Sequence, residues 1–150
     1  MLIHELNHTE CADVLRRNHL GRLACCRYDQ PYIVPIHFAF DEPQRCVYAF
    51  SKIGQKIEWM RENPKVCLEI EEIDDKNHWT TVIAMGRYEE ISQLEDGADA
   101  RRRAEFLFEQ RQEWWLPAGG RLPSREHGTV LVYAIQLDRV SGRRAARDVG

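Results

Sequence analysis

The sequence predicts a mainly β protein with peripheral α-helices, built as a small six-stranded antiparallel barrel. Six segments have the period-two alternation or the β-branched and aromatic content of strands, whereas three short stretches carry a helical apolar stripe. Two of the strands flank a turn at residues 41–44 and pair as a β-hairpin. A longer strand contains Gly86, and a missing side chain lets a sheet coil sharply enough to curl into a barrel.

The first strand of the hairpin, residues 33–40, has the clearest alternation. Every second residue from Val34 to Phe40 is large and apolar, so this set is expected to be buried. His37 belongs to the other set and faces a second surface. After the turn, residues 46–50 form the partner strand, which ends at Ser51.

A short helix is predicted to follow this hairpin. Ile53, Ile57 and Met60 recur at i, i+4 and i+7 and make one apolar stripe. The Asn63-Pro64 pair then ends the helix.

The start of this helix has an unusual charge. Its positive dipole end is surrounded by Lys52 and Lys56 instead of acids. A phosphate held by the helix N–H groups, the lysines and the Ser51 hydroxyl would explain this, and Gly54 would let the backbone approach closely. The alternative is that both lysines are solvated and Ser51 only caps the helix, and the local pattern does not separate the two.

The remaining elements are predicted from the same signals. Strands are expected at residues 20–27, 65–72, 78–92 and 129–141, with a charged loop at residues 71–77. Helices are expected at residues 10–18, capped by Thr9, and from Asp96 or Asp99 to Phe108. Arg22 is expected to be a surface ion-pair partner.

Composition sets the organisation and excludes several functions. The 150 residues fit a single domain, 1–150, with residues 142–150 as a flexible basic tail. A net charge of -3 gives no attraction for nucleic acid. No apolar run approaches a membrane span and the N-terminus lacks a signal-peptide pattern, so we expect a cytoplasmic protein without a membrane partner. The five cysteines form no CxxC and the acids have no metal-ligand spacing, which predicts reduced thiols and no metal site.

Two adjacent tryptophans stand out between the last predicted helix and strand. Trp114 and Trp115 lie in a connection that contains Pro, Gly and many charges. Indoles in such a segment are expected to pack against a partner subunit or a flat ligand. Core packing within the same subunit is the alternative.

Four segments together resemble a known family. GRLACC, PYIVPIHFAF, VYAFSKIGQKIEWMRENPKVCLEIEE and TTVIAMGRYEEI follow one another in the order and spacing of the pyridoxamine 5'-phosphate oxidase-like split-barrel flavoproteins. The sequence is most similar to their nitroimidazole reductase-like branch, over roughly residues 21–91. The resemblance implies an FMN-binding split barrel, a homodimer with FMN at the subunit interface, and a flavin-dependent oxidoreductase of nitroreductase or flavin-reductase type, with a small-molecule electron donor and acceptor.

The resemblance also assigns residues. The strand that borders the flavin ring matches Val34, Pro35, Ile36 and His37. The phosphate-binding turn matches Ser51, Lys52, Gly54, Gln55 and Lys56. Thr81 falls where the family places a polar side chain near the cofactor, and Trp114 and Trp115 are expected to help close the site or the interface. The sequence departs from true pyridoxamine phosphate oxidases because their arginine-rich cofactor strand is IVPIHFAF here and their C-terminal substrate motif is not evident.

His37 is the candidate catalytic residue, as a proton donor or a hydrogen-bond partner of flavin or substrate. A structural histidine bonded to a backbone carbonyl is the alternative. Two other functions stay open. One is a non-catalytic flavin-binding or sensor protein of the same fold. The other is a haem-binding or haem-degrading relative, in which His37 or His127 would ligate iron.

Overall fold

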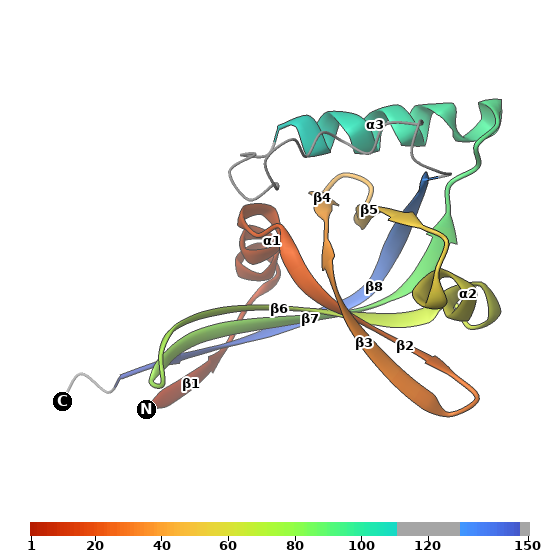
Figure 1. Cartoon of the computed structure of the whole chain (residues 1–150). Helices are drawn as coiled ribbons and strands as arrows, with labels where there is room; N and C mark the ends of the chain where they lie inside the picture. Colours follow the sequence, from red (N-terminus) through yellow and green to blue (C-terminus); the bar gives the residue numbers. More distant parts are fainter. Residues whose placement is uncertain (111–129, 148–150) are drawn as a thin grey trace, which may run out of the picture.

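The computed structural model describes residues 1–110 and 130–147 (Figure 1). The fold is mainly β with peripheral helices, as predicted. The strands are β1 (Leu2–Glu5), β2 (Leu20–Arg27), β3 (Gln30–His37), β4 (Ala39–Asp41), β5 (Cys46–Lys52), β6 (Lys65–Asp75), β7 (His78–Glu90) and β8 (Val130–Ala146). The helices are α1 (His8–Arg17), α2 (Gln55–Glu62) and α3 (Ala98–Glu109), the last preceded by a 3₁₀ turn, η1 (Glu95–Gly97).

All strands join one antiparallel sheet in the order β3-β2-β6-β7-β8-β5-β4, with β1 added to the far end of β8. The two outer strands of this order, β3 and β4, are separated in the chain only by Phe38, whose N–H donates to the His19 carbonyl at 2.9 Å. The sheet therefore curls back toward itself (Figure 1), as the predicted barrel requires.

The sheet has eight strands instead of the predicted six. All six predicted strands are present, but the strand at residues 33–40 is broken at Phe38 into β3 and β4. The other addition is β1, which pairs with the end of β8 through Leu2 opposite Ala146. The flexible tail expected at residues 142–150 is therefore wrong for residues 142–146, which continue β8. Figure 1 shows β1 and the far end of β8 side by side at one tip of the sheet.

Other boundaries also differ from the prediction. Helix α1 is capped by Asn7 instead of Thr9, because the Asn7 side chain accepts the Glu10 N–H at 2.9 Å and the Glu10 carboxylate accepts the Asn7 N–H at 3.1 Å. The predicted loop at residues 71–77 is mostly strand, since β6 continues to Asp75 and shifts register next to Ile73.

The inner side of the sheet and two helices form the main core. Strand β7 shows the division of its faces, with Val82 and Ala84 fully buried while Ile83 and Met85 are exposed. Helix α1 adds Val14 and Leu15 to this core. Helix α2 adds Ile57 and Met60.

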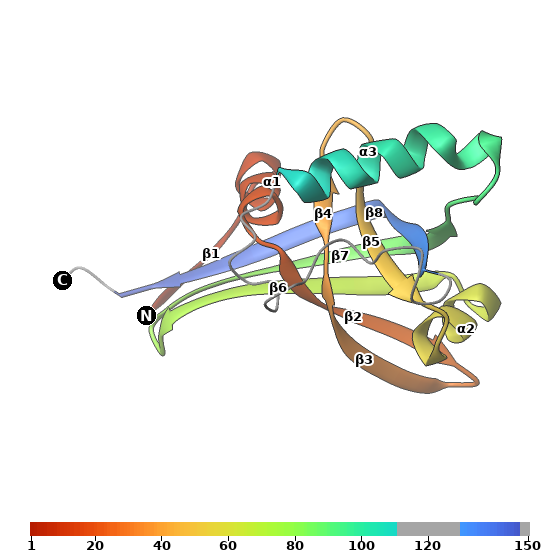
Figure 2. The ribbon, with the colours of Figure 1, turned by 45° about the horizontal axis from the view of Figure 1, so that its top comes forward.

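Helix α3 makes a separate apolar cluster over β4, β5 and the start of β8 (Figure 2). Its Ala104 packs with Tyr48 and Val132. The Arg103 guanidinium anchors the helix by donating to Asp41, whose side chain is fully buried, at 3.1 Å. None of the helices in residues 1–110 and 130–147 has the length and apolarity needed to cross a membrane.

Gly86 is the point where β7 bends, as predicted, because the pairing with β8 shifts register between Met85 and Gly86. A Cβ atom at Gly86 would lie 2.4 Å from the Gln136 carbonyl oxygen and 2.7 Å from the Ile135 side chain.

We therefore expect Gly86→Ala to lower the free energy of unfolding by about 1–3 kcal/mol, because the backbones of β7 and β8 must move apart. Urea denaturation measures the free energy of unfolding. If Gly86→Ala lowers it less than the substitution of the exposed neighbour, Arg87→Ala, the close approach of Gly86 to Gln136 would be contradicted.

Glu72 ties α1 to β6, since its carboxylate accepts hydrogen bonds from Arg17 at 2.7 Å and from Asn18 at 2.7 Å. These bonds hold the pKa of Glu72 below its usual range, the Arg17 bond contributing most. The stabilisation is therefore present above the unfolded pKa of about 4.3 and is lost as the pH falls through the lower folded pKa.

We expect Glu72→Gln to lower the free energy of unfolding by about 1 kcal/mol at neutral pH. Denaturation at several pH values should show the difference from wild type disappearing under strongly acidic conditions. Glu105→Gln, at an exposed residue of α3, is the control. If the loss of stability in Glu72→Gln persists unchanged in acid, the shape of the Glu72 side chain, and not its charge, stabilises the fold.

Candidate functional site

One row of paired residues crosses the outer side of the sheet. Pro35 lies opposite Arg22, Arg22 opposite Glu69, and Glu69 opposite Ile83. Ser141 of β8 completes the row opposite Ile83. Paired residues of antiparallel strands point to the same face, so five strands contribute to one surface, which we call the outer sheet face.

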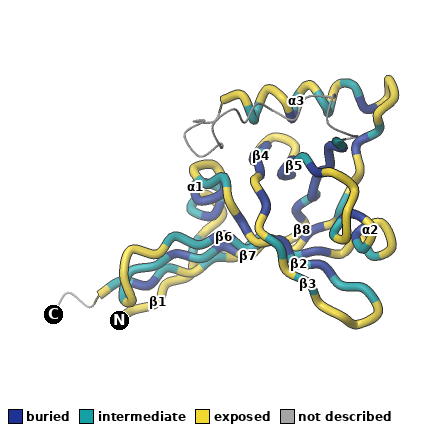
Figure 3. The backbone as a smooth tube through the Cα atoms, in the orientation of Figure 1, coloured by how far each residue is buried: buried dark blue, intermediate teal, exposed yellow. Residues whose placement is uncertain are grey.

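The outer sheet face carries large apolar side chains that residues 1–110 and 130–147 leave uncovered. Ile33 is 65% exposed, Leu20 56%, Met85 51% and Ile83 40%. Each lies in the row described above or two residues from it. From Thr80 to Arg87 of β7, buried positions alternate with half-buried or exposed ones (Figure 3). A cluster of exposed apolar residues on one face marks a surface that binds a ligand or another protein.

The predicted flavin-bordering strand lies at the edge of this face. Val34 and Ile36 turn their side chains inward, as predicted, so only their backbone borders the outer side. Pro35 and His37 turn outward and are exposed. The strand thus offers a rigid backbone and the His37 imidazole to anything bound there.

Thr81 lies further along the same face, in a groove of about 770 Å³ between β7 and β8. Thr81 and Ser141 supply hydroxyl groups to this groove, and Arg139 and Arg143 supply positive charge. Neither arginine side chain has an ion-pair partner in the part of the chain that the structure describes. Thr81 is three strands from β3, about 14 Å at the usual strand spacing, so one copy of the chain does not bring it next to His37.

The start of α2 differs in part from the prediction. The helix begins at Gln55 with Gly54 as N-cap, and no side chain caps it. Ser51 is therefore not the cap. It lies in β5, where its buried hydroxyl donates to the Lys52 carbonyl at 2.7 Å. Ile53 precedes the helix and is 49% exposed, so the predicted apolar stripe is wrong at this residue.

Two lysines lie at this uncapped helix start. Lys52 is exposed, whereas Lys56 is half-buried beside the Cys25 thiol, and burial lowers the pKa of its ammonium group. Neither lysine pairs with a carboxylate within residues 1–110 and 130–147. A Cβ atom at Gly54 would meet nothing within 4 Å, so the space beside this N-cap residue is open. Free N–H groups, cations and open space are the components of an anion site.

Helix α2 and β3 are held close together. The Trp59 ring packs on Tyr32 with ring centroids 5.5 Å apart, and the Arg27 guanidinium lies 4.9 Å over the Trp59 ring. The Asn63 amide also donates to the Cys26 carbonyl at 3.0 Å. These contacts hold α2, which follows the predicted phosphate-binding turn, against the tip of the β2–β3 hairpin, whose second strand is the predicted ring-bordering strand.

Two adjacent cysteines of β2 lie next to this site. Cys25 points into the core and Cys26 outward, as expected for successive strand residues. Burial raises the pKa of the Cys25 thiol, with a further contribution from Cys26, so the thiol stays neutral. In the described ranges no three His, Cys, Asp or Glu side chains gather where they could hold a metal ion.

Some residues of the outer sheet face were not predicted from the sequence to belong to a site. Arg139 and Ser141 fell at the end of a predicted strand, and Arg143 fell in the predicted tail. Glu69 is at the centre of the face, where burial and the neighbouring Glu71 raise its pKa. Arg22 pairs with both acids, 3.7 Å from Glu69, which confirms its predicted ion-pair role. Trp114, Trp115 and His127 lie outside the described residues.

Comparison with known proteins places the chain in a family. The sequence profile of the family described as "Pyridoxamine 5'-phosphate oxidase" matches residues 7–144. An uncharacterized protein of Rhizobium meliloti (strain 1021) is 38% identical over 148 residues, 97% of each chain.

Two solved structures are also similar to this chain. A protein of Mesorhizobium loti described as FAD-binding is 38% identical, with a TM-score of 0.79 over 97% of this chain and 100% of its own. An FAD-binding protein of Mycobacterium smegmatis shares the fold at 22% identity, with a TM-score of 0.65 over 95% of this chain and 98% of its own. The chain belongs to the pyridoxamine 5'-phosphate oxidase family.

Proposed function

We propose that the protein binds FMN, with the phosphate at the start of α2 and the ring on the outer sheet face beside β3. The uncapped helix start carries this proposal. Its N–H groups have no side-chain partner, and Lys56 is a half-buried cation with no carboxylate beside it in the described chain. A dianionic phosphate would satisfy both groups at once.

The outer sheet face supports the placement of the ring. The isoalloxazine ring is flat and largely apolar, and Leu20 and Ile33 present exposed apolar surface on β2 and β3, while Ile83 extends this apolar surface to β7. The backbone at Val34 and Ile36 and the His37 side chain provide polar contacts along one edge. This combination of apolar surface with a few fixed polar groups is typical of cofactor sites.

The relatives support a flavin. The Mesorhizobium loti protein, 38% identical to this chain, is described as FAD-binding. FAD contains the whole of FMN, so the proposed phosphate and ring positions would serve either cofactor. We propose FMN because the uncapped start of α2 provides for one terminal phosphate.

We further propose that a second copy of the chain covers the outer sheet face and completes the site. The face exposes four large apolar side chains that no element of the described chain covers. Thr81 lies about three strand spacings from His37 in one copy. A homodimer would let Thr81 of one copy and His37 of the other approach a single flavin.

The proposed activity is that of an FMN-dependent oxidoreductase of nitroreductase or flavin-reductase type. The bound flavin would supply the redox chemistry between a small-molecule donor and acceptor. The chain's own residues would hold the phosphate, fix the ring against β3 and exclude water beneath it. His37, exposed on this face, would place an imidazole near the ring as a proton donor.

One series of measurements tests this function. The absorbance spectrum of the purified protein distinguishes flavin from haem, and mass spectrometry of the released cofactor distinguishes FMN from FAD. We expect oxidation of NADH or NADPH with a nitroaromatic acceptor or free flavin. A flavin-loaded protein that neither nucleotide reduces would instead be the non-catalytic flavin-binding alternative.

Lys56→Ala tests the phosphate site. We expect the variant to bind FMN at least about tenfold more weakly, a change of about 1.4 kcal/mol, in a fluorescence titration. The flavin-free variant should be as stable as wild type or slightly more stable, because burial disfavours the Lys56 ammonium and the helix dipole repels it. Lys76→Ala in the β6–β7 turn is the control. If the flavin-free Lys56 variant unfolds while FMN affinity is kept, Lys56 is structural.

Ile83→Lys tests the dimer. We expect wild type to sediment as a dimer and the variant to shift toward monomer, because a charge at the centre of the outer sheet face would have to lose water on association. Leu94→Lys, at a residue that is 74% exposed next to η1, is the control and should remain dimeric. An Ile83→Lys protein that dimerises as tightly as wild type would place the interface elsewhere.

A further inference from the structure

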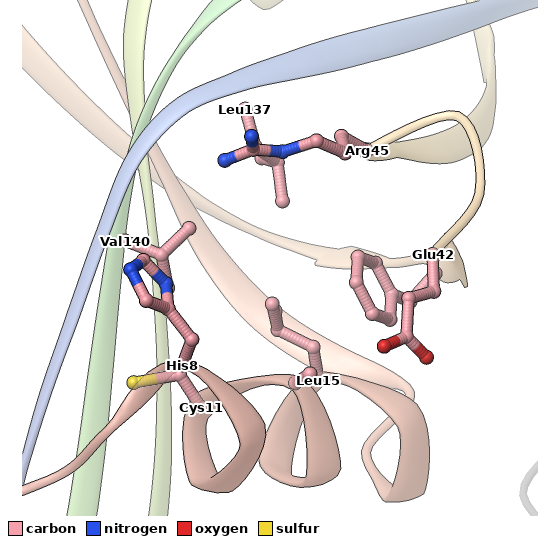
Figure 4. Close-up of a pocket in the computed structure, with 9 residues that line it drawn as sticks. His8, Cys11, Leu15, Glu42, Arg45, Leu137 and Val140 are labelled. Carbon is pink, nitrogen blue, oxygen red and sulfur yellow. The ribbon is translucent and has the colours of Figure 1, made fainter.

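A second hollow lies on the inner side of the sheet, away from the proposed flavin. It is a cavity of about 380 Å³ between α1, the β4–β5 turn and β8 (Figure 4), and we call it the α1 cavity. It has one lining residue, Val140, in common with the groove of the outer sheet face. Its volume lies at the lower end of the range of about 300–1,000 Å³ for ligand pockets.

The floor of the α1 cavity is apolar. It is formed by Cys11, Leu15, Phe40, Leu137 and Val140. Leu15 is 2% exposed, and Figure 4 shows it directed from α1 into the same space as Leu137 and Val140 of β8. Burial raises the pKa of the Cys11 thiol, with a smaller contribution from Glu10, so Cys11 is neutral and adds no charge to the floor. The floor therefore fits a hydrocarbon chain or ring.

Among the described residues, the unpaired charge on the rim of the α1 cavity is positive. Glu42 is the one acid on the rim, and its carboxylate is already paired with Arg16 of α1. Arg45 stands opposite α1 and has no carboxylate partner among the described residues. The His8 side chain, also on the rim, makes no hydrogen bond in the same described ranges. With Glu42 neutralised, an unpaired guanidinium dominates the rim.

The backbone holds Arg45 in place. Arg45 has a φ of 50°, its N–H donates to the Glu42 carbonyl at 3.0 Å, and its own carbonyl accepts the Leu137 N–H at 2.9 Å. These bonds fix the Cα–Cβ direction at the junction of the turn and β8. In Figure 4 the guanidinium lies beside Leu137, above the apolar floor.

We propose that the α1 cavity binds a small apolar monocarboxylate, with its carboxylate on Arg45 and its hydrocarbon part on the Leu15–Leu137–Val140 floor. An arginine binds a carboxylate through two parallel N–H donors, and the apolar floor favours burial of the rest of the molecule. A cationic ligand is disfavoured, because Glu42 is occupied by Arg16 and Arg45 would repel it. This site is independent of the proposed flavin site.

Isothermal titration of the flavin-loaded protein with 3-phenylpropionate and with octanoate tests the site, and the uncharged 3-phenylpropan-1-ol separates charge from apolar contact. We expect at least one carboxylate to bind. Arg45→Gln should weaken carboxylate binding at least tenfold and leave binding of the alcohol unchanged. Ala12→Phe, which fills the cavity from α1, should abolish binding of both kinds of probe. Arg102→Gln, on the exposed side of α3, is the control and should bind like wild type.

Three results would overturn the proposal: neither carboxylate binds wild type, Arg45→Gln binds carboxylate as tightly as wild type, or binding displaces the flavin, which its absorbance reports. If Ala12→Phe fails to fold, the comparison of Arg45→Gln with Arg102→Gln still decides the outcome.

Discussion

The whole structure depends on one constraint: a single curled sheet has two faces, and the described part of this chain covers only one of them with its main core. Alternate residues of β7 show the division, with Val82 and Ala84 fully buried and Ile83 and Met85 exposed. Helices α1 and α2 both add apolar residues to the inner core. The outer sheet face keeps Leu20 and its exposed apolar neighbours without a cover from the described chain, and the proposed flavin and second copy would supply that cover.

The charges at the start of α2 likewise call for a bound ligand. A helix N-terminus carries about half a positive charge, so an adjacent cation lowers stability unless an anion is present. Lys56 is half-buried at this position with a pKa lowered by burial, and no side chain caps the helix. The flavin-free chain thus holds an unfavourable arrangement that a phosphate would reverse. Strand β8 connects the outer sheet face to the α1 cavity, because its residues line both the outer groove and that cavity.

The fold could be predicted from the sequence where the signal was local. Period-two alternation and β-branched or aromatic content placed the six predicted strands, the alternation placed the residues of β3 that turn inward, and the glycine placed the bend at Gly86. Pairing between the chain ends could not be predicted. Neither β1 nor the end of β8 has an alternation of apolar residues that would predict a strand. The two segments pair with each other only in the folded sheet. Arg143 was missed for the same reason.

The site was predicted in part. Local pattern placed Lys52, Gly54 and Lys56 around a helix start, and the structure confirms that they gather there. Ser51 does not cap the helix, because its hydroxyl donates to the carbonyl of the next residue, a bond that no spacing rule reveals. The α1 cavity had no sequence signal at all, because its residues come from α1, β4, the β4–β5 turn and β8 and meet only in the fold.

The central claim is that the start of α2 binds the phosphate of a flavin. The most direct measurement is the affinity of the flavin-free protein for FMN and for riboflavin, which has the same ring but no phosphate, by fluorescence titration at two salt concentrations. The account predicts that FMN binds at least about tenfold more tightly, a difference of about 1.4 kcal/mol, and that the advantage shrinks as salt screens the lysines. Equal affinities at both salt concentrations would contradict it.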